Sequence, residues 1–293
     1  MSTLTKPMGR VWKNGVALAG LKKNKLAVLG VAIIALLVLV AVFAPVLAPH
    51  HPHEQNLEQA LLAPSWEYPL GTDDFGRCLL SRIIYGTGIS LAIGLIVTAI
   101  SVITGVVLGL LAGFYGGLVD EAIMRLVDIF LAFPGLILAI VVAGLLGPGM
   151  FNVLLALALV GWMGYTRVVR GAVLAEKEKP FVETAVSLGA GDLYIMTKHL
   201  LPNVISPVLV MATLGTGQAI LAAASLSFLG LGVQPPTPVW GSMLNDGKQY
   251  LQTAPGLTIF PGLAIMITVL SFNFLGDGLR DLLDPRLKNK NVA

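Results

Sequence analysis

The segment LAVLGVAIIALLVLVAVFAPVLA, residues 26–48, decides the fold, because it runs for 23 residues without a charged side chain. As an α-helix rising about 1.5 Å per residue, it would extend ~34 Å, enough to cross a hydrocarbon core of about 30 Å. It is longer than the apolar region of a secretory signal peptide and 25 residues precede it, so we expect an uncleaved membrane anchor. The low share of charged residues, 12%, and the mean hydropathy of +0.83 agree.

Further apolar stretches long enough to span a bilayer follow at 88–113, 126–147, 151–168, 203–232 and 254–276. Because these stretches are continuous and do not alternate with a period of two, they indicate helices and not a β-barrel. The sequence therefore predicts an all-α membrane protein with six transmembrane helices. We expect one transmembrane domain over 26–278, between a basic amino-terminal tail (1–25) and a carboxy-terminal tail (279–293).

The basic residues predict the orientation of this bundle. Of the 19 Lys and Arg residues, only Arg77, Arg82 and Lys248 fall on the side opposite the amino terminus. Because Lys and Arg are retained in the cytoplasm during membrane insertion, both termini are predicted to be cytoplasmic. The loop between the fourth and fifth spans, about 169–202, is predicted to lie on the same side.

The spans carry no ionisable side chain between their ends. Each such residue would cost about 2.5–3.5 kcal/mol at the bilayer centre, and proton relays require them. This disfavours a proton-coupled transporter, although a sodium-coupled secondary transporter or a channel stays open as an alternative. The segment GSMLNDGKQ (241–249) has neither the spacing nor the Ser/Thr of a phosphate loop, so we expect this chain to bind no ATP or other cofactor.

Catalytic and metal-binding patterns are weak. The sequence sets up no nucleophile with a base, so we expect a non-catalytic subunit, and an intramembrane enzyme is the least favoured alternative. The single cysteine, Cys78, excludes a site with several cysteine ligands. His50, His51 and His53 could gather a transition metal, but a solvated loop is the favoured interpretation, and no metal site is assigned. The net charge of +3 follows from the loop lysines and arginines, so no nucleic acid partner is expected.

The second predicted span carries glycines at four-residue spacing. One helix face would then have almost no side chains, which lets a neighbouring backbone approach closely. We interpret this row as a helix-packing face, and a surface on which helices slide during transport is the alternative. The row consists of Gly105, Gly109, Gly113 and Gly117.

The segment FVETAVSLGAGDLYIMTKHLLPN (181–203) is a polar interruption between two spans. Pro180 suits the first turn of a helix, and Glu183 lies near that amino end, where the helix dipole favours a carboxylate. Gly189 and Gly191 suit a left-handed turn that ends this helix.

A second helix is predicted next, capped by Asp192 and closed before Pro202. Connectors in compact proteins usually have about 2–8 residues. The length and order of this segment therefore predict a docking surface instead of a plain connector.

The order of residues in this segment resembles the EAA loop of the membrane subunits of ABC importers, in which E-A-A, three residues, Gly and nine residues precede I-x-L-P. Thr184 replaces the second motif residue and His199 replaces the Ile. The resemblance implies that the segment couples the chain to an ATPase. The implied coupling residues are Glu183, Thr184, Ala185, Gly189, Gly191, Leu201 and Pro202.

Longer stretches resemble the DppC-type permeases of the dipeptide/oligopeptide/nickel importers, a family with the type I ABC permease bundle. They are LKKNKLAVLG (21–30), LGTDDFGRCLLSRIIYGTGISL (70–91), GGLVDEAIMRLVDIFLAFP (116–134), SFLGLGVQPPTPVWGSMLND (227–246) and FPGLAIMITVLSFNFLGDGLRDLLDPRL (260–287). The family usually has Asp after GR, where this chain has Cys78.

The resemblance implies a multi-pass protein of the inner membrane, in contact with lipid, that forms half of a translocation path. The implied partners are a DppB-type permease paralogue, two cytoplasmic ABC ATPase subunits that use the ATP, and an extracytoplasmic solute-binding protein. Di- or oligopeptides are the expected cargo. Nickel or a metal chelate is the alternative, which PHHPHE (49–54) and Cys78 favour slightly.

Overall fold

The computed structural model describes residues 24–283, and the regular elements in that range are helices. Five helical segments are long and apolar enough to cross a membrane, and a bent pair of helices can supply a sixth span. The predicted all-α class with about six spans is therefore confirmed. The five segments are α3 (Lys25–Val42), α5 (Leu79–Tyr115), α8 (Met150–Lys177), the helical run Asp192–Phe228 that ends in α11 (Leu201–Phe228), and α13 (Gly256–Leu283).

The span predicted as one helix over 126–147 is bent. It consists of α6 (Gly117–Leu131) and α7 (Gly135–Leu146), whose axes differ by 86°. Pro134 has no backbone N–H, and its ring forces Phe133, the residue before it, away from the helical conformation. The helix therefore ends before Phe133 and restarts after Pro134, a break that the apolar pattern of this stretch conceals.

The first span, predicted as one helix over 26–48, ends earlier: α3 stops at Val42, and a separate short helix, α4 (Ala44–Leu47), follows it. Helices α5, α8 and α13 instead extend beyond the predicted apolar spans. Helix α5 begins at Leu79 instead of 88, and at about 1.5 Å per residue its 37 residues measure ~56 Å, well over the hydrocarbon thickness. The apolar pattern marks only the part of a helix that faces hydrocarbon. Helix α11 instead stops short of the predicted 232, because Gly230, at φ +82°, forms a left-handed turn in which Leu231 N–H bonds to Leu226 O.

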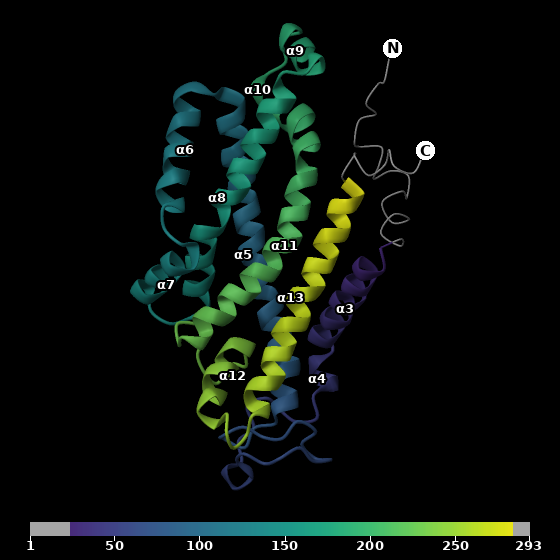
Figure 1. The fold of residues 1–293 in the computed structure, drawn as a ribbon, viewed down its shortest axis with the longest axis vertical. Helices are drawn as coiled ribbons and strands as arrows, with labels where there is room; N and C mark the ends of the chain where they lie inside the picture. The colour runs from purple at the N-terminus through teal and green to yellow at the C-terminus, as the bar shows by residue number, and fades with distance from the viewer. Residues whose placement is uncertain (1–23, 284–293) are drawn as a thin grey trace.

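The two ends of the bundle are different (Figure 1). Helix α9 (Pro180–Ser187) lies at one end, here named the α9 end, and the start of α3 and the finish of α13 point towards that end. The loop 49–78 and the short helix α12 (Trp240–Gly247) lie at the other, the α12 end. Arg77, Arg82 and Lys248 belong to the α12 end. The three basic residues that were predicted to lie on the same side of the membrane therefore lie at the same end of the bundle. The predicted tails reach into residues 1–23 and 284–293, outside the described range.

Helices α5 and α8 form the centre of the bundle, and the glycine row of α5 faces α8. A Cβ atom at Gly109 would lie 2.7 Å from Cβ of Val169 and 2.8 Å from the carbonyl oxygen of Thr166. Real Cβ atoms do not approach so closely, so only glycine lets the two backbones approach this far. Gly105 and Gly113 make equivalent contacts with Tyr165 and Val173.

Gly117 does not belong to this packing face, contrary to the prediction. It is the first residue of α6, directly after Gly116 between the two helices, at φ +51°, and a Cβ there would meet nothing within 4 Å. Its neighbour Gly116, at φ +68°, ends α5, which turns the chain away from α8 before the row can continue. Four-residue spacing places residues on one face only within a continuous helix. Because α5 ends before Gly116, the fourth glycine of the row does not lie on the packing face.

Candidate functional site

Helix α9 protrudes from its end of the bundle (Figure 1), and its start follows the predicted rules. Pro180 occupies the first turn, and Glu183 lies in that turn near the positive end of the helix dipole. At the other end, Gly189 has φ +80° and Ala190 N–H bonds to Ala185 O at 3.0 Å, which makes the predicted left-handed turn. The side chain of Glu183 is exposed.

The next helical segment begins differently from the prediction. Gly191 is extended, at φ −71°, and is itself the N-cap of α10 (Asp192–Tyr194), so it is no part of the left-handed turn. Asp192 is the first helical residue and makes no capping hydrogen bond. A single left-handed residue, Gly189, is enough to reverse the chain, which leaves Gly191 free to start the following helix.

The helix predicted to close before Pro202 does not close. The chain continues from α10 through a π-helical turn, η2 (Ile195–Leu200), directly into α11, and Leu201 N–H bonds to Met196 O five residues earlier. The wider π turn accommodates the missing N–H and the ring of Pro202, which would clash inside a regular α-helix. The segment after Gly189 is therefore one unbroken helical path from Asp192 to Phe228.

The inner face of α9 is held by apolar contacts. Val182 and Ala185 are buried in a cluster with Ile195 and Leu200 of η2 and with Val173 of α8. The side chain of Ala185 thus points into the bundle. It positions α9 and is not itself available to a partner.

The outer face of the same element is apolar and exposed, which the sequence analysis did not identify. Leu188 is 82% exposed and Leu193 is 72% exposed. We name this surface the tip patch, and it consists of Phe181, Val186, Leu188, Leu193 and Tyr194. The tip patch lies on α9 and α10, at the extreme end of the bundle (Figure 1), so hydrocarbon does not explain its exposure.

Ion pairs brace the bundle next to α9. Arg170 of α8 holds both carboxylate oxygens of Asp120 of α6, at 2.5 and 2.6 Å, and Arg167 contacts Asp128 at 2.5 Å. Lys177, the last residue of α8, donates to Phe114 O of α5 at 2.6 Å. These contacts tie three helices together at the α9 end, so a force on α9 would act on a connected group of helices and not on a loose loop.

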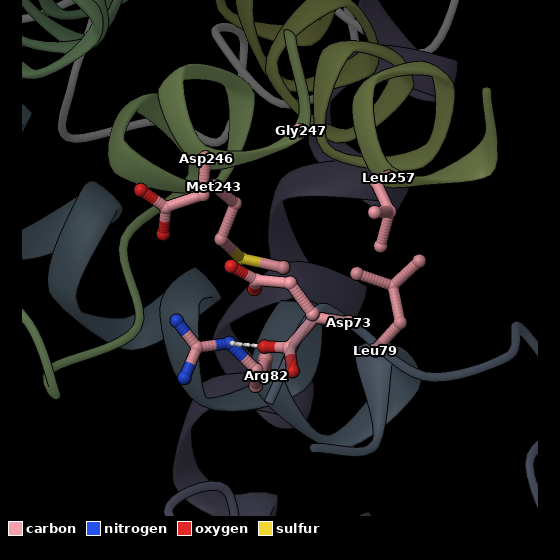
Figure 2. A pocket seen from close by; sticks show the side chains of 8 residues that line it. Asp73, Leu79, Arg82, Met243, Asp246, Gly247 and Leu257 are labelled. Carbon is pink, nitrogen blue, oxygen red and sulfur yellow. Dashed lines mark ion pairs between the residues drawn. The ribbon is translucent and has the colours of Figure 1, made fainter. Parts of the chain in front are cut away.

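A second polar cluster lies at the α12 end, in a small pocket shown in Figure 2. Asp73 accepts from Nε of Arg77 at 2.6 Å and faces Nε of Arg82 at 3.4 Å, and both arginine side chains are almost fully buried. Met243 and Asp246 of α12 line the other side of the pocket. Burial raises the pKa of the Asp246 carboxyl above its usual value.

The side chain of Arg82 connects α5 with the loop 49–78 and with the segment before α12. Its Nη1 lies 3.4 Å from Pro52 O and 3.5 Å from Pro236 O, while its Nε faces Asp73. The arrangement contains no nucleophile with a base, and it joins the loop 49–78 to α5 and to the segment before α12. Removal of one partner would leave a buried charge unpaired, which is strongly destabilising.

The three loop histidines and Cys78 make only local contacts. His50 stacks on Tyr68 at 4.7 Å between ring centroids, and His51 Nδ1 accepts from the backbone of His53. Cys78 is buried at the N-cap of α5 and makes no capping hydrogen bond there. Across residues 24–283, no three His, Cys, Asp or Glu side chains are grouped so that they could hold a metal ion.

Comparison with known proteins decides the family. Residues 105–289 match the family model described as binding-protein-dependent transport system inner membrane component. The chain belongs to this family. Residues 9–64 of the permease match a second model, the N-terminal transmembrane domain of oligopeptide transport permease C. It is thus a multi-pass inner-membrane protein, and its helices form a type I ABC permease bundle.

Curated relatives cover almost the whole permease. The dipeptide transport system permease protein DppC of Alkalihalophilus pseudofirmus is 47% identical over 92% of this chain and 88% of its own length. The protein of the same name from Haemophilus influenzae is 46% identical, over 91% and 92%. The glutathione transport system permease protein GsiD of Pectobacterium atrosepticum is 44% identical, over 91% and 89%. All three are named as transport permeases and not as enzymes.

Proposed function

We propose that this permease is the DppC-type subunit of an ATP-driven importer of di- or oligopeptides. The similarity to relatives named for dipeptides and for glutathione, itself a short peptide, supports this cargo. A DppB-type paralogue supplies the other half of the translocation path, and an extracytoplasmic solute-binding protein delivers the peptide to the α12 end. The grouped loop arginines and lysines support a cytoplasmic α9 end and cytoplasmic termini.

Two separate ABC ATPase subunits drive transport, and the permease itself binds no ATP. The tip patch is the observation that supports this proposal, because it gathers exposed apolar side chains on α9 and α10, at the end of the bundle that is predicted to be cytoplasmic. Leu188 and Leu193 insert into a cleft of one ATPase subunit, and Glu183 lies beside them. Buried apolar anchors of this kind usually contribute most of the binding energy of an interface.

The helical path from Asp192 to Phe228 transmits the movement. Its 37 residues form a continuous helical path, ~56 Å long at about 1.5 Å per residue, that begins in the docking element and crosses the membrane. When the ATPase subunits close on ATP, α10 moves with them and α11 follows as a rigid body. Docking must favour one transmembrane state over the other, since a partner that binds both states equally shifts nothing.

Charge placed in the tip patch tests the docking surface. L188D and L193D should each lower the affinity for the ATPase subunits about 30-fold or more, because loss of an apolar anchor costs about 2 kcal/mol. The measurement is the amount of ATPase that co-purifies with the permease in mild detergent. Both side chains are exposed, so folding is expected to be unaffected.

L57D is the matched control. Leu57 is 71% exposed but lies at the α12 end, so this variant should keep its ATPase subunits. Full retention of ATPase by L188D and L193D would refute docking through the tip patch.

Two further measurements test the proposed cargo and energy source. Parallel uptake assays on the whole complex, with a labelled dipeptide and with nickel, should show ATP-driven accumulation of the peptide. Accumulation of nickel but not of the peptide would overturn the proposed cargo. Accumulation by the purified permease alone would favour a sodium-coupled secondary transporter or a channel and contradict the dependence on ATPase subunits.

A further inference from the structure

A long apolar groove lies between α11 and α13, with Leu244 of α12 on its third side. Its volume is about 610 Å³, and it is lined by one face of residues 221–229 and one face of residues 262–270. Among the described lining residues only Ser225 has a polar side chain, and its hydroxyl bonds to Leu221 O at 2.9 Å inside α11. The walls therefore offer a ligand apolar contacts along their whole length. We name this feature the α11–α13 groove.

The α11–α13 groove begins near the α12 end and runs towards the middle of the bundle. Phe228 is the last residue of α11 and Gly262 lies near the start of α13, so both mark the end of the groove next to α12. Leu221 and Leu270 line the opposite end. The rise from Gly262 to Leu270 is ~12 Å at about 1.5 Å per residue, less than half of a hydrocarbon core of about 30 Å. The groove thus fits within the leaflet at the α12 end.

Lys248 lies at the mouth of the groove. Its Nζ is 5.6 Å from the centroid of the Phe228 ring, a cation–π distance, and Phe228 lines the groove. The backbone N–H of Lys248 bonds to the carbonyl oxygen of Leu244, so Lys248 follows that lining residue by one helical turn. Lys248 also falls between the predicted apolar spans 203–232 and 254–276, where a lysine reaches the level of the lipid headgroups. A positive charge therefore marks the polar end of an apolar groove.

The charge of Lys248 has no acidic partner in the described part of the chain. The two arginines of this end are buried and paired with Asp73, whereas Lys248 is exposed and its Nζ donates to the neutral Asn245 Oδ1 at 2.7 Å. No Asp or Glu within residues 24–283 forms an ion pair with it. The neighbouring carboxylate, Asp246, lines the other pocket, which Figure 2 shows. An ammonium has three N–H groups, so donors remain for an anion.

We propose that the α11–α13 groove binds an anionic phospholipid, with one acyl chain between α11 and α13 and the phosphate at Lys248. A single lipid supplies both an apolar chain of the right direction and a negative charge at the mouth. A transmembrane helix of another subunit would need an acidic side chain at one defined position to do the same. Attraction between basic residues and anionic lipids is a general source of lipid selectivity. The inference requires only the membrane location and is independent of the proposed cargo and ATPase docking.

The test is photo-labelling by two lipids that differ only in the headgroup. The purified permease, with the subunits that co-purify with it, is placed in phosphatidylcholine vesicles. The vesicles contain a trace of phosphatidylglycerol or of phosphatidylcholine that carries a photoreactive group at the end of one acyl chain. Labelling should concentrate on Leu221, Val269 and Leu270 at the deep end of the groove. Leu36 of α3, which is 58% exposed, reports the background from bulk lipid.

The headgroup preference should depend on Lys248. The phosphatidylglycerol probe should label the groove about fivefold more than the phosphatidylcholine probe, whose choline cancels the charge of its phosphate. Lys248→Gln should remove this preference and leave the weaker labelling by phosphatidylcholine unchanged. Lys198→Gln is the matched control, because Lys198 is also exposed and forms no ion pair within residues 24–283 but lies at the α9 end.

Occupation of the groove should depend on the space at Gly262. A Cβ there would lie 3.8 Å from Cδ2 of Leu244, an ordinary contact, so a larger side chain can enter the groove. Gly262→Leu should lower labelling by both probes about tenfold, because displacement of two methylene groups of the chain is sufficient for such a loss. The control is Gly171→Leu, at a position of α8 where a Cβ would meet nothing within 4 Å.

Three results would overturn the proposal. Equal labelling of the wild-type groove by both probes would remove the role of the phosphate, as would a preference for phosphatidylglycerol that survives in Lys248→Gln. Labelling of the groove no stronger than that of Leu36 would show that no lipid is held there. Loss of a second permease subunit from Gly262→Leu would then identify a helix as the occupant.

Discussion

Replacement of Gly109 by alanine should destabilise the permease through one defined contact. The new Cβ would lie 2.7 Å from Cβ of Val169 and 2.8 Å from Thr166 O, and neither atom can move unless the backbone of α8 moves. Overpacking of this kind costs about 1–3 kcal/mol. Alanine also favours the helix over glycine by about 0.5–1 kcal/mol, which offsets part of that cost.

The control is Gly171→Ala, in α8 itself, where a Cβ would meet nothing within 4 Å. It receives the same helical gain without the clash, so the two variants should differ by the overpacking alone, about 1–3 kcal/mol. Thermal unfolding of the purified permease should then place Gly109→Ala at least about 2 °C below Gly171→Ala. Equal melting temperatures, or a higher one for Gly109→Ala, would refute the packing role of the glycine row.

Three other changes have defined outcomes. Burial raises the pKa of the Asp246 carboxyl above its ordinary value of 3.8, so the folded protein keeps this proton to higher pH than the unfolded chain does. The stability of the fold should therefore decrease as the pH rises from about 3.8 through the pKa of the folded state. Asp246→Asn should flatten this dependence of the melting temperature on pH. Gly189→Val forces a β-branched residue to φ +80°, at a cost of about 1–2 kcal/mol, and should reduce uptake more than membrane expression. Cys78→Ser should raise the melting temperature, because a serine hydroxyl can cap α5 where the thiol makes no bond; a fall would show that burial of the thiol matters more.

The apolar runs were sufficient to predict the helical class and the approximate spans, because hydrocarbon selects for side chains that the sequence displays directly. They could not reveal the bend between α6 and α7, since the predicted apolar run 126–147 continues across it and only Pro134 marks the break. The same limit explains the ends of α5, where Leu79 lies among polar residues outside the apolar window.

The coupling segment was predictable where local chemistry decides the conformation. Pro180 starts α9 and Gly189 ends it, as their backbone preferences require. The π turn before Pro202 could not be predicted, because it depends on how the burial of Ile195 and Leu200 holds the helix together across the proline. The exposure of Leu188 could not be predicted either, because the sequence shows that a residue is apolar but not whether its side chain faces the core or a partner.

Site-directed crosslinking tests the central claim, that a separate ATPase grips the permease through the tip patch. In a Cys78→Ser background, single cysteines at Leu188 and at Leu57 would be labelled with a short thiol-reactive photo-crosslinker, which needs no cysteine on the partner, and irradiated in membranes that contain the whole complex. The account predicts an adduct between the permease and an ATPase subunit from L188C and none from L57C. No ATPase adduct from L188C, or equal adducts from both positions, would contradict it.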